Sequence, residues 1–231
     1  MRFTKIAGIL ILLSSCALAG NVPVGNYSFE DPNLGTGYTY RPTGLGIDWT
    51  FTGSAGIAGD QSGFDLDYAG YSNPAPDGNQ AGFLQYAPEN PNSSPGTISQ
   101  TITGLTAGDS YVVSFDAANR PDIGLPPMFY GGGQNFDVYW DGVEIYSIVG
   151  LTDLTTTFAA FKTIQFVATD ADALNGGTLE FAVVTGMDGD RSDFIDAVQL
   201  ETVPEPSAWL LLLSGVGLLG LGLRGRLIHS R

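Results

Sequence analysis

Apolar and polar residues alternate with a period of two over much of the chain between residues 21 and 201. In the run 111–118, and again in 136–140, large apolar residues recur at every second position. Successive side chains of a β-strand point to opposite faces, so this spacing predicts strands with one buried face. Asp141 and Gly142 then form a two-residue turn signal that leads into a further run, 143–148, and indicates a hairpin.

Similar short runs elsewhere are separated by clusters of glycine and proline, whereas no segment keeps the three-four apolar spacing of a helix. The remaining expected strands are 49–52, 80–86, 97–103, 161–168, 178–185 and 194–201. About nine short antiparallel strands joined by turns favour an all-β sandwich. The body, residues 21–201, has the length of one domain.

The first 19 residues have the pattern of a secretory signal peptide and lie outside that body. Arg2 and Lys5 precede the apolar run 6–13, which is too short to span a bilayer, and 17–19 is a small-x-small cleavage site. Cys16 is the only cysteine, and lipoprotein processing at this residue remains an alternative. Cleavage after residue 19 removes it, so the mature chain has no disulfide, thiolate metal site or cysteine nucleophile.

The charge of the body is strongly negative. All 24 acidic residues lie between Glu30 and Glu205, and only four basic residues accompany them there, which leaves a net charge of −20. Such a surface repels phosphate backbones, and nucleic-acid binding is therefore excluded. Outside the cell, carboxylates also suit Ca²⁺, which prefers oxygen ligands.

The C-terminal tail, residues 203–231, contains Pro204-Glu205-Pro206, an uncharged run over 207–223, and then Arg224 and Arg226. As a helix the run is about 25 Å long, enough for a short transmembrane span. The arginines beyond it place this end in the cytoplasm and the body outside. A permanent single-pass anchor is one interpretation that length and charge leave open.

The order of these tail features resembles the PEP-CTERM sorting signal of Gram-negative bacteria. The resemblance implies recognition by an exosortase-type membrane protease, cleavage near Pro204-Glu205-Pro206, and delivery to the cell surface or an extracellular matrix. Such proteins typically occur beside exopolysaccharide machinery. The chain is therefore expected to be exported, and to be held at least transiently in the inner membrane.

The body also contains a familiar series of motifs. It opens with Asn26-Tyr27-Ser28-Phe29-Glu30, continues through 114–121, and closes with Phe194-Ile195-Asp196-Ala197-Val198. The series resembles the galactose-binding-like jelly rolls that include many carbohydrate-binding modules. The resemblance implies two packed sheets, often a structural calcium and often sugar binding. Matched to the calcium ligands of that family, the residues here are Glu30 and Asp196, joined by backbone carbonyls and Asp31.

The strand pattern itself draws attention to Asp196, because alternation over 194–201 puts it on one face with Phe194, Val198 and Leu200. A carboxylate in line with apolar residues needs a cation, a metal or several hydrogen-bond donors. Donors from an adjacent turn are the alternative to calcium. A second acidic cluster is a weaker calcium candidate and comprises Asp188, Asp190 and Asp193.

The only histidine, His229, lies in the tail, so a Ser-His-Asp triad, a histidine-zinc site and a histidine base are absent from the body. No catalytic residue is assigned. For sugar binding, Arg120 with Asn119 at a strand end, and Asn79 with Gln80 in a loop, offer planar polar groups. An ion pair is the alternative role of Arg120.

Exposed aromatic side chains provide platforms on which a sugar ring stacks. Tyr38, Tyr40, Tyr71 and Tyr130 are predicted to lie in loops, whereas Trp49 and Trp140 share parity with core residues. Together these features predict a non-enzymatic surface or matrix protein that binds polysaccharide or packs in an exopolysaccharide matrix. The alternatives are a carboxylate-pair glycan hydrolase and a purely structural surface protein.

Overall fold

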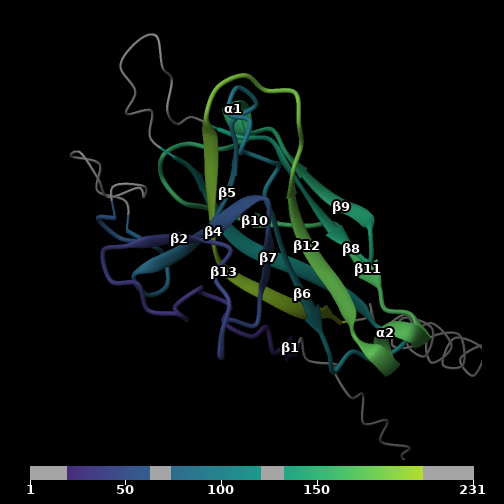
Figure 1. Cartoon of the computed structure of the whole chain (residues 1–231). Helices are drawn as coiled ribbons and strands as arrows, with labels where there is room; N and C mark the ends of the chain where they lie inside the picture. Colours follow the sequence, from purple (N-terminus) through teal and green to yellow (C-terminus); the bar gives the residue numbers. More distant parts are fainter. Residues whose placement is uncertain (1–19, 63–73, 121–132, 205–231) are drawn as a thin grey trace, which may run out of the picture. The chain divides into compact units, whose positions relative to one another are not determined.

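The computed structural model describes residues 20–62, 74–120 and 133–204 (Figure 1). The predicted signal peptide, Tyr71, Tyr130 and the tail from residue 205 onward lie outside these ranges. Within the described residues, no helix has the length and apolar character that a membrane crossing requires.

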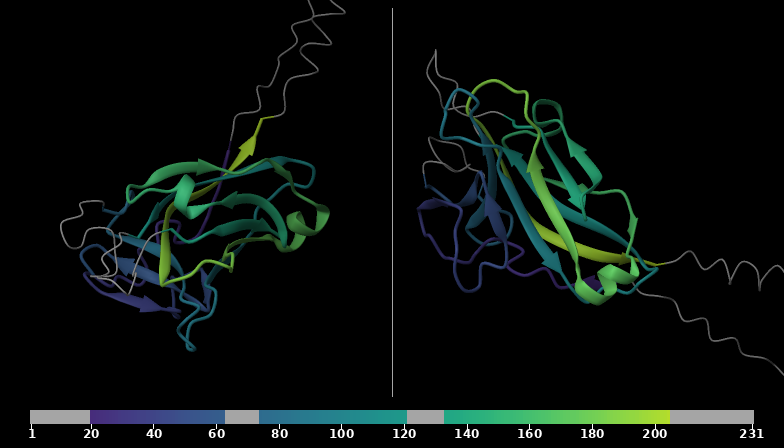
Figure 2. Two further views of the ribbon diagram at one scale, coloured as in Figure 1. Left: turned by 90° about the horizontal axis from the view of Figure 1, so that it is seen from above. Right: turned by 45° about the vertical axis from the view of Figure 1, so that its right-hand side comes forward.

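Two antiparallel sheets form the body, and the two views of Figure 2 show them as separate layers. The main path of the larger sheet is β10 (Ala159–Lys162), β7 (Ser110–Asn119), β13 (Arg191–Val203), β5 (Gln80–Tyr86), β4 (Ser54–Gly59) and β2 (Tyr38–Tyr40), with β1 (Asn21–Val22) paired to β13 and β11 (Phe166–Val167) paired to β7. The smaller sheet is β3 (Thr50–Thr52), β6 (Thr97–Ile102), β12 (Gly177–Val183), β8 (Phe136–Trp140) and β9 (Val143–Ile148). The predicted all-β antiparallel sandwich is confirmed.

Side chains from the inner faces of both sheets form one continuous core. Phe115 of β7 meets Phe136 and Phe181 from the opposite sheet, with ring centroids 6.3 Å and 5.2 Å away. Trp49 and Trp140 are both buried in this core. The alternation in the sequence reflects this arrangement, because only the residues of one parity reach the second sheet.

Several elements differ from the expected ones. The expected strand 161–168 is divided into β10 and β11, because the Thr163 hydroxyl accepts the hydrogen bond of the Val113 N–H at 3.1 Å. Strands β2 and β4 were missed, since β2 has three residues and β4 consists mainly of small residues. Helices α1 (Gly150–Asp153) and α2 (Asp170–Asn175) are too short to show a helical period.

The last strand contains a bulge that changes its parity. Ala197 has φ of +50°, and the pairing of β13 with β7 shifts between Asp196 and Gln199. Ile195 and Val198 consequently both point into the core, while Asp196 stays on the outer face with Phe194. The expectation that Asp196 shares a face with Val198 is therefore wrong.

Candidate functional site on the outer face of the larger sheet

The outer face of the larger sheet carries a second apolar cluster, separate from the main core. The strand register aligns Tyr40 with Gly56, Gly56 with Phe83, Phe83 with Phe194, and Phe194 with Ala118. We call this line of residues the outer-face row. Phe83 and Phe194 are 0% and 1% exposed. Since the outer face of an antiparallel sheet is ordinarily polar, the row needs a separate explanation.

Tyr40 belongs to the row because Gly56 leaves it room. A Cβ atom at position 56 would lie 2.0 Å from the Thr39 carbonyl oxygen and 2.7 Å from Cζ of Phe83. Without that atom, the ring of Tyr40 packs edge-on against Phe83 with centroids 5.1 Å apart and an interplanar angle of 89°. The glycine thus brings an aromatic ring and its hydroxyl to the same spot.

Beside the row lies a cavity of about 290 Å³. Its lining residues are Tyr40, Arg41, Gly53, Ser54, Gln85, Ala87, Asn90, Asn92, Ser93, Ser94 and Asp190. Within it, the Tyr40 hydroxyl donates to Oε1 of Gln85 at 2.5 Å, and Nε2 of Gln85 donates to Oδ1 of Asp190 at 2.5 Å. A hydrogen-bonded chain therefore runs from a phenol at the aromatic row to a carboxyl group in the cavity.

The surroundings of this chain favour the protonated forms of both end groups. Burial raises the pKa of Asp190, and the Gln85 hydrogen bond and the Arg120 charge only partly oppose this effect. Burial is the largest cause that raises the pKa of Tyr40 to about 12. Asp190 is therefore a candidate proton donor, and Tyr40 remains a neutral phenol at physiological pH.

Of the residues predicted from the end of β7, Arg120 lies near this cavity and Asn119 does not face it. Arg120 is buried, and its charge acts on both Tyr40 and Asp190. Asn119 points inward, where Nδ2 donates to the carbonyl oxygens of Gly150 and Leu154 at 2.9 and 3.1 Å. A role of either residue in ligand binding stays a prediction.

The other predicted pair, Asn79 and Gln80, lies against Glu30. One carboxylate oxygen of Glu30 accepts from the backbone N–H groups of both residues, at 2.7 and 2.8 Å. The side chain of Gln80 is buried and donates to the carbonyl oxygens of Phe29 and Pro32. Gln80 thus supports the loop that holds Glu30.

Asp196 contacts the same turn at Asp77. Its Oδ2 accepts from the backbone N–H of Asp77 at 2.9 Å, while its Oδ1 is buried without a hydrogen-bond partner. Burial raises its pKa to about 8, and the negative charges of Asp77 and Glu30 act in the same direction. A free, buried carboxylate oxygen beside a second carboxylate fits an oxygen-binding cation such as Ca²⁺.

The second acidic cluster is not a single site. Asp190 lines the cavity, Asp188 is exposed, and Asp193 is fully buried on the opposite side of β13. In the described ranges, no group of three or more His, Cys, Asp or Glu residues has an arrangement that could hold a metal.

Sequence reasoning missed Phe83 and Gln85, although it predicted their strand. The sequence of β5 contains the relevant signal, because the strand has apolar residues on both faces. Ala81 and Phe83 lie on one face and Leu84 lies on the other, and all three are buried. A strand that is apolar on both faces is covered on both faces. The sequence of β5 therefore indicates that the outer face of this strand is covered.

At the C-terminal end, Pro204 is the only residue of the predicted sorting motif within the described ranges, and it is exposed. Glu205, Pro206, Arg224 and Arg226 lie outside them. The PEP-CTERM protein-sorting model matches residues 202–226. The protein is accordingly exported to the cell surface and processed by an exosortase.

Solved structures provide further comparisons. A Stig cyclase from Fischerella sp. TAU in complex with (3Z)-3-(1-methyl-2-pyrrolidinylidene)-3H-indole has 16% identity and a TM-score of 0.57, covering 82% of this chain and 100% of its own. A cyclase from the same organism, in complex with 4-(1H-indol-3-yl)butan-2-one, has 17% identity and a TM-score of 0.56, covering 81% and 99%. These identities show a shared fold. No curated protein matches the chain.

A carbohydrate-binding module, TmCBM61 in complex with beta-1,4-galactotriose, has 18% identity and a TM-score of 0.47, covering 80% of this chain and 100% of its own. A likeness of that level carries no conclusion about sugar binding.

The HpiC1 cyclase model matches residues 20–201, which is all of the sandwich except the last two residues of β13. Cyclases are enzymes, so the prediction of a non-enzymatic protein is wrong. The absence of histidine and cysteine from the body does not exclude an enzyme, because acid catalysis by a single partly buried carboxyl group requires neither residue. The chain belongs to the HpiC1 cyclase family, joined to a PEP-CTERM sorting motif.

Proposed function

We propose that the body is an exported cyclase that acts on an aromatic substrate of the indole class by acid catalysis in the cavity beside the outer-face row. The observation that carries this proposal is the position of Asp190. Its pKa is raised, it lines a cavity of about 290 Å³, and it is linked through Gln85 to Tyr40 of the row. Family membership and the indole compounds bound in the two Fischerella structures support the substrate class.

The proposed reaction is a proton-neutral isomerisation. Asp190 donates its proton to an electron-rich double bond of the substrate, which leaves a carbocation and the Asp190 carboxylate. A second double bond or the indole ring attacks the cation, and a new carbon–carbon bond closes the ring. The resulting cation then loses a proton to the Asp190 carboxylate, so the acid is regenerated and the product has the mass of the substrate.

The neighbouring residues have separate parts in this proposal. The amide of Gln85 is held by Tyr40 on one side and orients Asp190 on the other, which leaves the second carboxyl oxygen available for the substrate. Tyr40 is the aromatic residue of the row that lines the cavity, and its ring would stabilise a developing cation there, as aromatic faces do.

The first test is binding of 4-(1H-indol-3-yl)butan-2-one to the full chain in detergent, measured by saturation-transfer NMR. We expect binding by the wild type and by Asp190→Asn, because the amide keeps the shape of the carboxyl group. Absence of binding to the wild type would refute the assignment of an indole-class ligand.

The second test is turnover of indoles that carry tethered alkenes, followed by mass spectrometry in D₂O. We expect cyclised isomers that contain one deuterium, and a loss of at least a hundredfold with Asp190→Asn, in line with the usual contribution of a general acid. Asp193→Asn is the matched control, since this buried acid faces away from the cavity. An Asp190→Asn variant with unchanged turnover would refute the assignment of the proton donor.

A carbohydrate is a second candidate ligand for the same cavity, because one wall consists of amides and hydroxyls that include Asn90, Asn92, Ser93 and Ser94. Galactan and exopolysaccharide fragments in the same NMR experiment distinguish the two classes. Saturation transfer to the sugars but not to the indole would favour this second candidate.

Calcium is proposed as a structural ion rather than as a participant in the reaction. Glu30 and Asp196 would hold it, and it would supply the positive charge that the buried oxygen of Asp196 lacks. The ion would thereby fix the 77–80 turn, which adjoins the start of β5.

A further inference from the structure

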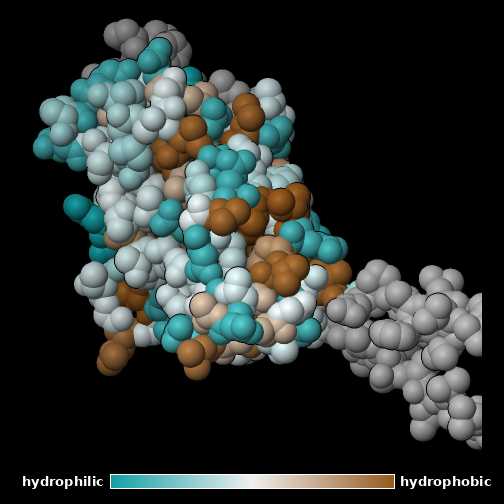
Figure 3. All heavy atoms as spheres, turned by 90° about the vertical axis from the view of Figure 1, so that its right-hand side faces the viewer, coloured by the Kyte–Doolittle hydropathy of each residue, from teal (hydrophilic) through white to brown (hydrophobic). Residues whose placement is uncertain are grey.

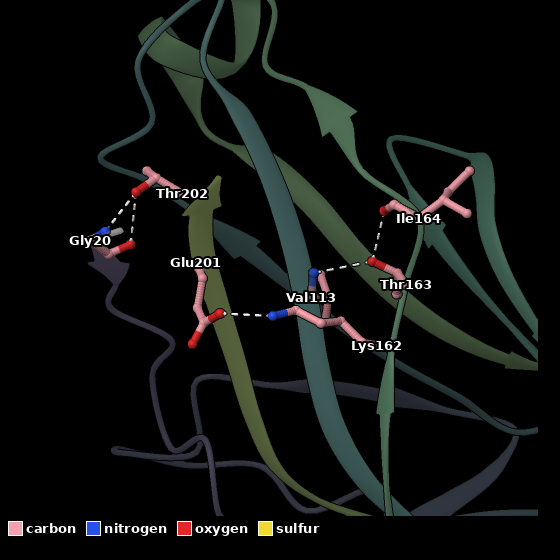
Figure 4. Close-up of polar contacts among 7 residues, drawn as sticks. All are labelled: Gly20, Val113, Lys162, Thr163, Ile164, Glu201 and Thr202. Atoms are coloured by element: carbon pink, nitrogen blue, oxygen red, sulfur yellow. Dashed lines mark hydrogen bonds and ion pairs between the residues drawn. The ribbon is translucent and has the colours of Figure 1, made fainter. Parts of the chain in front are cut away.

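The body begins and ends at one place on its surface. The N–H of Gly20 donates to the Thr202 hydroxyl at 2.6 Å, and this hydroxyl donates to the Gly20 carbonyl at 3.2 Å (Figure 4). The Thr202 N–H donates to the same carbonyl at 2.8 Å. Strand β1 continues this contact by pairing Asn21 with Glu201. The chain therefore leaves the sandwich for its sorting tail beside the residue that follows the signal peptide.

Strand β11 lies one strand away from this exit. Val203, at the end of β13, and Val167, in β11, are both register partners of Ser110 in β7. Adjacent strands are about 4.8 Å apart, so the Val167 and Val203 backbones are about 10 Å apart. Val167 thus stands next to the point at which the tail begins.

The segment before β11 is held against the same end of β13. Lys162 Nζ forms an ion pair with Glu201 Oε2 at 3.1 Å, and the Thr163 hydroxyl accepts from the Val113 N–H (Figure 4). Following β11, Ala168 accepts from the Gly108 N–H and donates to the Asp109 carbonyl. Helix α2 begins two residues later, so 162–175 is one continuous strip at the exit.

Three exposed aliphatic side chains project from this strip: Ile164 (62% exposed), Val167 (58%) and Leu174 (81%). We call them the exit face. Figure 3 looks onto the side of the body that carries β9, β11 and α2, and apolar residues gather on it. A group of exposed apolar side chains on an otherwise acidic surface is typical of an interaction site.

We propose that the exit face rests on the surface of a zwitterionic lipid bilayer while the sorting tail is inserted. Only three residues, Pro204 to Pro206, separate β13 from the uncharged run 207–223, and they span at most about 10 Å. The bilayer therefore lies within reach of Val167 whenever the run is inserted. Asp109 and Asp170, both exposed, flank the exit face and disfavour anionic lipid.

Bilayer contact orients the body. A linker of three residues restricts distance but permits rotation, whereas three inserted aliphatic side chains select one orientation. Removing two of them lowers the ratio of contacting to non-contacting bodies on the order of tenfold. The contact would hold the sorting motif at a fixed height for a membrane protease.

The experiment uses the full chain in phosphatidylcholine nanodiscs, in a Cys16→Ser background, with a fluorophore on Ala107→Cys in the exposed turn before β7. Lipids with a spin label near the headgroup quench the fluorophore when the exit face contacts the bilayer. The test variant is Val167→Thr with Leu174→Gln. The matched control is Val149→Thr with Leu45→Gln. Both residues are exposed and lie outside the strip 162–175 that carries the exit face.

We expect strong quenching in the wild type and the control, and a severalfold loss in the test variant. Replacing half of the lipid by phosphatidylglycerol should also reduce quenching. Equal quenching in all variants would overturn the proposal, because the tether alone would then set the distance. A cross-linked dimer that only the test variant loses would also overturn it and assign the face to a second copy. Leu174→Gln alone provides the same comparison if the double variant has a lower melting temperature.

Discussion

The fully buried carboxyl group of Asp193 supports a quantitative prediction about stability. Its Oδ1 accepts from the Gln134 N–H at 3.0 Å, whereas its Oδ2 is buried without a partner. Asn119 is the register partner of Asp193, and its side-chain oxygen is also buried without a donor. Because Nδ2 of Asn119 already donates to two carbonyl groups, the orientation of this amide is determined.

Burial raises the pKa of Asp193 well above its ordinary value. The stability associated with its neutral form is fully present below the unfolded pKa, near 3.9, and is lost as the pH rises through the folded-state pKa. The loss amounts to about 1.4 kcal/mol per pH unit while only the unfolded chain is ionised.

Asp193→Asn removes this titration and keeps the acceptor for Gln134. An amide cannot ionise, so at pH 5, about one pH unit above the unfolded pKa, the variant avoids a penalty of about 1.5 kcal/mol. We expect a free energy of unfolding about 1–3 kcal/mol above that of the wild type at pH 5, with an advantage that grows towards pH 7.

Urea denaturation of both proteins at pH 5, 6 and 7 measures this difference, and the other raised carboxyl groups cancel in the comparison. A variant that is less stable than the wild type at every pH would refute the reasoning. It would mean that Asp193 is charged in the folded protein and is balanced by a cation.

Three further predictions concern the site, the ion and the termini. Gly56→Ala should lower the free energy of unfolding by about 1–3 kcal/mol, because the new Cβ would overlap the Thr39 carbonyl and displace Phe83. Thermal melting measures this loss, and an unchanged melting temperature would contradict the packing of the outer-face row. Millimolar Ca²⁺ should raise the melting temperature and EDTA should reverse the rise, whereas Glu30→Gln should abolish the response; insensitivity of the wild type to EDTA would exclude an ion coupled to folding. Thr202→Val should lower the stability of the contact between the two ends of the body by about 1 kcal/mol, because the hydroxyl that binds Gly20 is lost. Hydrogen exchange at Asn21 and Val22 should then be faster. Unchanged exchange would show that the β1 pairing alone closes this end.

Much of the sandwich was predictable because its strands are amphipathic. The alternation in 111–118 and 136–140 marks β7 and β8, and the Asp141-Gly142 turn has φ angles of +47° and +76°, as a two-residue hairpin turn requires. Strands β2 and β4 escaped because a run of three residues, or of small residues, has too little contrast between its faces.

The candidate site was less predictable, since it depends on register. Tyr40, Phe83 and Phe194 come from distant parts of the chain and meet only because Gly56 aligns with Phe83 and Phe83 with Phe194. The acidic residues showed the same limit. Spacing grouped Asp190 with Asp193, but the two differ in parity along the strand and face opposite sides of β13.

The sequence by itself determined the destination of this protein and its sandwich architecture. Charge order and the length of apolar runs act locally, and a period of two reports burial on one face without knowledge of the partner strand. The tertiary structure alone decided which acids are buried and which aromatic rings meet on the outer face. It also turned Asp196 away from Val198 through the bulge at Ala197. These properties depend on contacts between residues far apart in the chain, and local pattern carries no information about such contacts.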